Sequence, residues 1–317
     1  MWLINSSIGR KLVMAITGAV LVLFVTFHCL MNGVAMFWPA AYNSICEFLG
    51  ANWYALAGTV VIAALLILHI IYAVWLTLQN RKARGNDRYD VVSKPKQVEW
   101  ASQNMLVLGI VILAFFVVHL IQFWCKMQFA EIFGIPQFDP EVEGVAVPYA
   151  AGTWFIQIAF SQWYTLPIYL IGFVALWFHL THGMWSMFQS IGWDGSVWFN
   201  RLKTIANWWS SIVVLLFIAQ GIIFTVNANN SRYTECPVLQ EQYIEMMMEG
   251  SEAALPAGIP DCCAAEAKKA ECCEKHEGDC CKEAQDCEKK QCEGTCQKEC
   301  GKCADTEKVE SVNTSNE

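Results

Sequence analysis

The chain has 317 residues, of which 55% are hydrophobic and 13% aromatic, and its formal net charge is -8. Its apolar runs exceed the about 20 residues needed to cross a bilayer, which excludes a soluble globular protein. The charge is an average over two regions: residues 1–228 hold 11 basic and 9 acidic residues, whereas residues 229–317 hold 10 and 20. We therefore predict a membrane domain at 1–228 and a polar tail at 229–317.

Five apolar runs predict an all-α bundle of five transmembrane helices, at about 10–37, 54–80, 101–125, 164–190 and 205–226. The first run is roughly twice as long as the apolar core of a signal peptide, so we expect it to be retained. Lys and Arg gather before the first run and in the second and fourth loops, and Lys126 alone lies in the first and third loops. Since positive residues favour the cytoplasm, the N-terminus is expected inside and the tail outside.

Histidines are the ionisable residues inside these runs. They are His28, His69, His119, and on the fourth run His179 and His182. An ionisable group at membrane depth is costly and usually marks a functional site. A rise of about 1.5 Å per residue puts His28 and His119 about 27 Å from the inner ends of their helices, and His69 and His179 about 17–18 Å. The depths predict an outer pair, His28 with His119, and an inner pair, His69 with His179.

Two facing helices can supply both axial ligands of a b-type haem, and iron with both positions filled serves electron transfer. The pairs therefore predict two haems enclosed by the bundle. The alternative is that these histidines only hydrogen-bond between helices. His182 lies one turn from His179 and is an alternative ligand for the inner iron.

The segments SSIGRKLVMAITG and FHLTHGMWSMFQSIG, together with the four spaced histidines, carry a resemblance over about residues 6–226. The chain resembles the cytochrome b membrane anchor of succinate dehydrogenases and fumarate reductases, in the single-subunit, five-helix, two-haem branch. The resemblance implies His28, His69, His119 and His179 as haem ligands, the last standing four positions before Gly183.

The same resemblance implies partners in a bacterial cytoplasmic membrane: a flavoprotein subunit with FAD and the dicarboxylate site, an iron–sulfur subunit, and menaquinone or menaquinol as substrate. No nucleic-acid partner is expected. The rival functions are the dihaem anchor of a hydrogenase or formate dehydrogenase and, from a different class, a metal transporter.

Several other residues have two possible roles, one functional and one structural. Glu47 is the one carboxylate of the first outer loop and could accept a proton from quinol, or be a solvated loop acid. Ser6, Ser7, Arg10 and Lys11 could contact haem propionates or the iron–sulfur subunit, or anchor the helix at the membrane surface. Some family members carry a carboxylate on helix four for proton movement, and this chain has none between Leu166 and Ser190.

The tail is the part that the resemblance does not cover. Residues 261–303 contain 11 cysteines and almost no aliphatic side chains. Such a segment cannot offset its ordering entropy without cross-links or metal, and we expect it to be disordered. Disulfides and thiolate binding of zinc or copper(I) are the alternatives.

Overall fold

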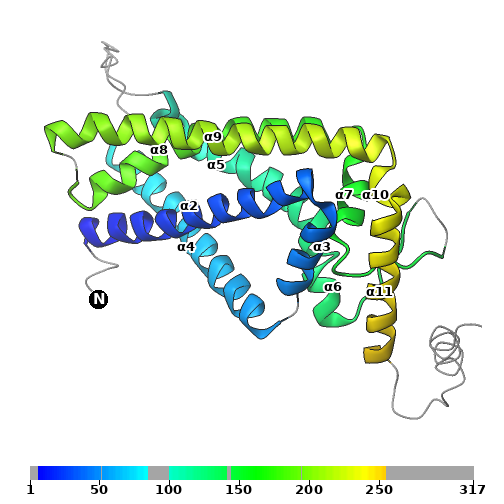
Figure 1. Ribbon diagram of the computed structural model, residues 1–317. Helices are drawn as coiled ribbons and strands as arrows, with labels where there is room; N and C mark the ends of the chain where they lie inside the picture. Colours follow the sequence, from blue (N-terminus) through cyan, green and yellow to red (C-terminus); the bar gives the residue numbers. More distant parts are fainter. Residues whose placement is uncertain (1–5, 51, 85–99, 141–143, 194, 255–317) are drawn as a thin grey trace, which may run out of the picture. The chain divides into compact units, whose positions relative to one another are not determined.

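The computed structural model describes residues 6–50, 52–84, 100–140, 144–193 and 195–254 (Figure 1). The described residues belong to one compact unit that ends at Ala254. Part of the basic second loop, residues 85–99, and the 11 cysteines predicted to lie in a disordered tail fall outside them.

Five helices are long and apolar enough to cross a membrane, which confirms the predicted transmembrane character. They are α2 (Ser7–Phe37), α4 (Trp53–Arg84), α5 (Trp100–His119) continued by the π-helix η1 (Leu120–Trp124), α8 (Thr165–Ser190) and α9 (Ser196–Asn229). A helix satisfies its own backbone polar groups, so these apolar runs can lie in lipid. The helices begin or end within a few residues of the predicted bounds, except that α9 begins nine residues early and takes in Arg201 and Lys203.

The segments expected as loops also contain helices. The first holds α3 (Pro39–Phe48), which begins with proline because that residue lacks the N–H that a first turn leaves unbonded. The third holds α6 (Gln128–Phe133) and α7 (Gly152–Phe160). Gly134 ends α6 with φ 61°, a left-handed conformation that glycine adopts without strain. Short helices of this kind left no apolar run long enough to be recognised in the sequence.

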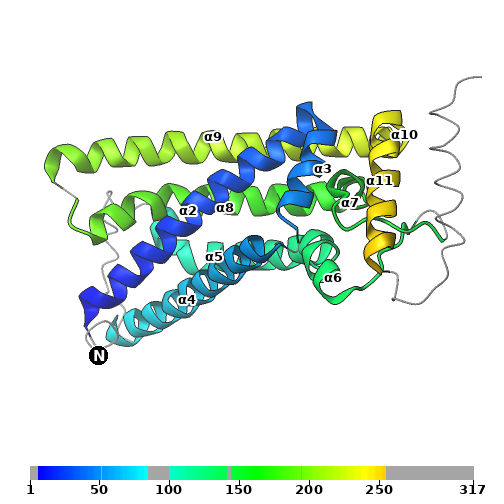
Figure 2. The same cartoon turned by 60° about the horizontal axis from the view of Figure 1, so that its bottom comes forward.

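Packing between the long helices is uneven. The most extensive contacts join α8 to α9 and to α5, and α2 to α4 and to α8, whereas α4 has few contacts with α5. Figure 2 shows α8 and α9 running side by side. The buried core is largely aromatic, with Phe155, Tyr169, Phe173 and Phe224 among its members. The α8 helix is therefore central, because it contacts α2, α5 and α9.

The first residues of the predicted tail form α10 (Arg232–Glu235) and α11 (Pro237–Ala254). These helices gather with α3, α6 and α7 at one end of the bundle (Figure 1). Contacts join α10 to α7 and α11 to α3. The helical part of the chain thus extends about 25 residues beyond the change in composition at Asn229.

A buried polar cluster holds this end together, and Asn43 is its centre. Its Oδ1 accepts from the backbone N of Thr153 at 2.9 Å and from Thr153 Oγ1 at 2.8 Å, while its Nδ2 donates to Gln242 Oε1 at 3.0 Å. Burial raises the pKa of Tyr243 to about 12. Its hydroxyl therefore stays protonated at neutral pH, lies 2.7 Å from Thr153 Oγ1 and donates to the carbonyl of Tyr233 at 2.9 Å.

We expect Asn43→Ala to destabilise the protein, because the substitution leaves the buried N–H of Thr153 without an acceptor. An unsatisfied buried donor costs about 1–3 kcal/mol. Thermal unfolding of the purified chain in detergent measures the effect. Asn104→Ala is the matched control, since that partly buried asparagine makes a solvent-exposed hydrogen bond to the carbonyl of Trp100 in its own helix. Equal unfolding temperatures for the two variants would contradict the role given to Asn43.

Candidate functional site

The first candidate centre is formed by His28 on α2 and His119 on α5. Their ring centroids lie 5.7 Å apart with the planes at 89°. Both side chains are half-buried. Six aromatic rings from five elements surround them: Phe24, Phe115, Phe116, Phe123, Tyr169 and Phe217. The two imidazoles therefore face each other in an environment with few competing polar groups.

The second candidate centre is formed by His69 on α4 and His179 on α8. Their ring centroids lie 6.3 Å apart with the planes at 62°. The Nδ1 atom of His179 is buried and has no hydrogen-bond partner among the described residues. The structure thus brings the four histidines together in the same two pairs that their depths in the sequence predict.

The separation of the two histidine pairs follows from residue spacings along α2 and α8, because each of these helices contacts both pairs. Thr17 on α2 lies 3.2 Å from His69 Nδ1, eleven residues before His28. Tyr169 on α8 lies 3.2 Å from His119 Nδ1, ten residues before His179. At about 1.5 Å per residue, both helices put the pairs about 15–17 Å apart along the bundle. Both centres therefore fit within a hydrocarbon core of about 30 Å.

His182 has different neighbours from His179. Its ring packs edge-to-face against the ring of Trp185, with the ring centroids 5.0 Å apart. Lys203 Nζ lies 4.5 Å from the centroid of the same indole. His179, one turn before it, is the histidine whose ring contacts His69. These contacts favour His179 over His182 as the partner of His69.

The donor set of each centre suits a haem better than a bare metal ion. Among the described residues no three His, Cys, Asp or Glu side chains come together, whereas protein zinc sites use three or four such ligands. A haem needs only two, because its macrocycle supplies the rest. With metal–nitrogen bonds of about 2 Å, two axial imidazoles have centroids roughly 6 Å apart. The observed 5.7 and 6.3 Å agree with that spacing.

Directly after His119 the chain leaves α-helical geometry. Residues Leu120–Trp124 form the π-helix η1, and Gln122 within it lies 2.9 Å from the hydroxyl of Tyr169. Single π-turns inside helices occur frequently at functional sites. A continuous helix was predicted here, because a π-turn leaves the apolar pattern unchanged.

The predicted accessory residues lie at the ends of the bundle. Glu47 is exposed on α3. Ser6 caps α2 by accepting from the backbone N of Gly9 at 2.9 Å, and Arg10 lies over the ring of Trp75 at 5.7 Å. Ser7 and Lys11 are exposed. These positions leave both interpretations of each residue open.

Sequence reasoning missed the hydroxyl groups beside the imidazoles, Thr17 and Tyr169. The signal was present: a helix that carries a ligand for one pair must also cross the level of the other pair. Counting about 15 Å along α2 and α8 from His28 and His179 leads to these two residues.

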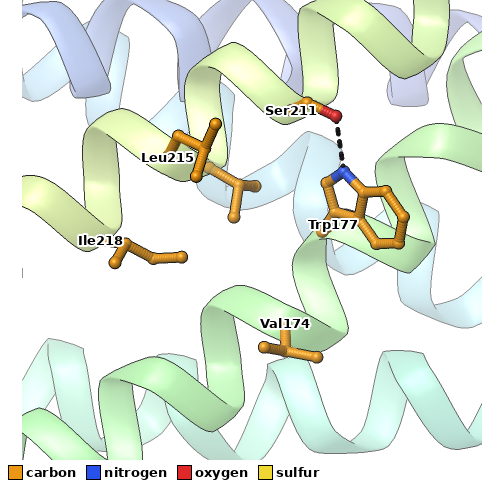
Figure 3. Close-up of a pocket in the computed structure, with 6 residues that line it drawn as sticks. Val174, Trp177, Ser211, Leu215 and Ile218 are labelled. Atoms are coloured by element: carbon orange, nitrogen blue, oxygen red, sulfur yellow. Dashed lines mark hydrogen bonds between the residues drawn. The ribbon is translucent and has the colours of Figure 1, made fainter.

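An open groove of about 300 Å³ lies between α8 and α9 (Figure 3). Its lining is largely apolar and includes Val174, Leu215 and Ile218. The polar groups at its wall bond to each other, since Trp177 Nε1 donates to Ser211 Oγ at 2.9 Å. Its lining contains none of the four paired histidines, so the groove is separate from the two centres.

Comparison with protein-family models, curated proteins and solved structures finds no match to this chain. The candidate function therefore rests on the residues and on the geometry of the two pairs.

The position of His119 depends on close packing at Gly172, where we expect Gly172→Ala to be destabilising. A Cβ at Gly172 would collide with the ring of Phe115, which lies one turn before His119. Overpacking of this kind costs about 1–3 kcal/mol. Thermal unfolding in detergent measures the loss.

Gly109→Ala on α5, the helix that carries Phe115, is the matched control for Gly172→Ala, because nothing lies within 4 Å of the added methyl group. That variant should unfold at or above the temperature of the unmodified chain, since alanine is the better helix former. A Gly172→Ala protein as stable as this control would refute the packing argument.

Proposed function

We propose that this chain is a dihaem b-type cytochrome that anchors a succinate:quinone or quinol:fumarate oxidoreductase in the membrane. The observation that carries the proposal is the meeting of four histidines, from four different spans, in two pairs with the spacing of axial imidazoles. His28 and His119 would hold one haem, and His69 and His179 the other. When bound, each haem supplies a one-electron carrier.

The side chains around the pairs support electron transfer over catalysis on a substrate. Each pair would supply two ligands to its haem iron, so that no site on the iron would be open for oxygen or a dicarboxylate. The aromatic rings around His28 and His119 make the surroundings of that pair apolar. A low-polarity surrounding of this kind tunes the potential of a centre and limits side reactions.

The proposed partners would bind at the two ends of the bundle. We propose that the end with Ser6, Arg10 and Lys203 faces the cytoplasm and meets the iron–sulfur subunit, which in turn binds the flavoprotein. The opposite end, with α3 and α6, would meet menaquinone or menaquinol. Electrons would pass between these ends through the two centres, which lie about 15–17 Å apart.

The central test is a dithionite-reduced minus oxidised absorbance spectrum of the full-length chain, purified in detergent after expression with adequate haem supply. We expect two low-spin b haems per chain. His119→Ala and His179→Ala should each remove one of them, because each substitution deletes an axial ligand.

His182→Ala is the matched control and should retain both haems, since its ring contacts Trp185. A folded chain without haem would overturn the proposal. Loss of a haem in His182→Ala with retention in His179→Ala would exchange the two assignments. Copurification of a flavin-bearing partner from the native membrane separates this assembly from a hydrogenase or formate dehydrogenase anchor.

Glu47 is our proposed proton acceptor for quinol oxidation at the α3 end. We expect Glu47→Gln to slow quinol oxidation by the assembled complex, because general bases contribute about 10²–10⁴-fold to such steps. Haem content should stay at two per chain. Glu241→Gln on α11 is the control, and equal oxidation rates for the two variants would assign Glu47 to the solvated surface.

A further inference from the structure

A chain of hydrogen bonds runs from the backbone of α7 to the ring of His119. Thr165 Oγ1 lies 2.6 Å from the carbonyl of Ala159, Gln122 Nε2 lies 3.1 Å from Thr165 Oγ1, and Tyr169 Oη lies 2.9 Å from Gln122 Oε1. The last contact, at 3.2 Å, joins Tyr169 Oη to His119 Nδ1. Thr165 and Tyr169 are buried, so their hydroxyl groups must find hydrogen-bond partners within the protein.

The carbonyl of Ala159 sets the direction of the whole chain, because a carbonyl only accepts. Thr165 must therefore donate to it and accept from the Gln122 amide. That orientation presents Oε1 of Gln122 to Tyr169, which donates its one proton there. Tyr169 then has only lone pairs left for the imidazole, so Nδ1 of His119 carries a proton and Nε2 carries the lone pair.

Thr17 fixes the ring of His69 in the same way. Its hydroxyl donates to the carbonyl of Val13 in its own helix at 2.8 Å, and it is 2% exposed. The hydroxyl proton is thus committed, and the 3.2 Å contact with His69 Nδ1 requires the imidazole to donate.

We propose that Tyr169 and Thr17 are positioning residues, which hold His119 and His69 with the proton on Nδ1 and the lone pair on Nε2. This inference rests on the proposed function, because it assigns Nε2 of each ring to haem iron. The hydrogen bond also makes the imidazole a stronger electron donor, which favours the oxidised iron and lowers the potential of the centre.

The two contacts are not equivalent. Tyr169 belongs to a relay of hydrogen-bonded groups that polarise one another, whereas Thr17 is a single hydroxyl bonded to its own helix. In the second pair, Nδ1 of the partner His179 has no hydrogen-bond partner among the described residues. Tyr169 should therefore lower the potential of the His28–His119 centre more than Thr17 lowers the potential of the His69–His179 centre.

The test is a redox titration of the full-length chain in detergent, followed by absorbance, with each component assigned by its absence in His119→Ala or His179→Ala. In Tyr169→Phe we expect both haems to remain and the potential of the His28–His119 centre to rise. At a fixed solution potential its reduced-to-oxidised ratio should increase about three- to tenfold, tenfold being 59 mV for one electron. Thr17→Val should raise the potential of the His69–His179 centre by a smaller amount.

Matched controls remove the same groups elsewhere. Tyr54→Phe deletes a tyrosine hydroxyl that bonds the carbonyl of Phe48, and Thr77→Val deletes a hydroxyl bonded to its own helix at Ala73. Both should leave both potentials unchanged. Gln122→Leu keeps the Tyr169 hydroxyl but removes the group that accepts its proton, so Tyr169 becomes a weaker acceptor for Nδ1–H of His119. It should raise the His28–His119 potential, by less than Tyr169→Phe does.

The outcomes separate the two proposals. A wild-type chain without haem overturns the proposed function and this inference with it. Two haems with unchanged potentials in Tyr169→Phe, Gln122→Leu and Thr17→Val overturn the inference alone. Equal shifts at both centres in each variant would also overturn it, since that result indicates a general change of structure. If Tyr169→Phe does not fold, Gln122→Leu decides.

Discussion

The structure depends on one constraint: a polar group placed at membrane depth must find its hydrogen-bond or metal partner within the protein. Several polar side chains of the membrane-spanning helices have such a partner. Threonines in α2, α4 and α9 bond carbonyls of their own helices. Gln220 on α9 donates to the carbonyl of Cys29 on α2 at 2.8 Å. The four histidines meet in pairs, and the buried Nδ1 atom of His179 has no hydrogen-bond partner among the described residues.

The same constraint explains why single helices serve both centres. The α2 helix supplies a histidine to one pair and Thr17 to the other, and α8 supplies a histidine to one pair and Tyr169 to the other. A tilt or shift of either helix would therefore alter both pairs together. The α9 helix carries no histidine, yet it packs along α8 and bonds α2 through Gln220, so it braces the two shared helices.

Much of this arrangement could be predicted from the sequence, because the features concerned are long and periodic. Five apolar runs define the spans, and a constant rise per residue converts the positions of His28, His69, His119 and His179 into depths. The short helices at the α3 end could not be predicted in the same way. Asn43, Thr153 and Gln242 come from distant parts of the chain, and only the folded structure brings them into one cluster. The ligands and partners remain predictions, since they lie beyond the chain itself.

The π-turn after His119 makes the length of the chain at this point as important as its composition. An extra residue is accommodated within Leu120–Trp124, and the helix is wider there. Deleting one residue from this segment would allow ordinary helical winding, in which each position advances by about 100°. Gln122 and the residues after it would then turn away from Tyr169. Related chains that differ here by a single insertion or deletion would consequently have a different set of neighbours for the same histidine.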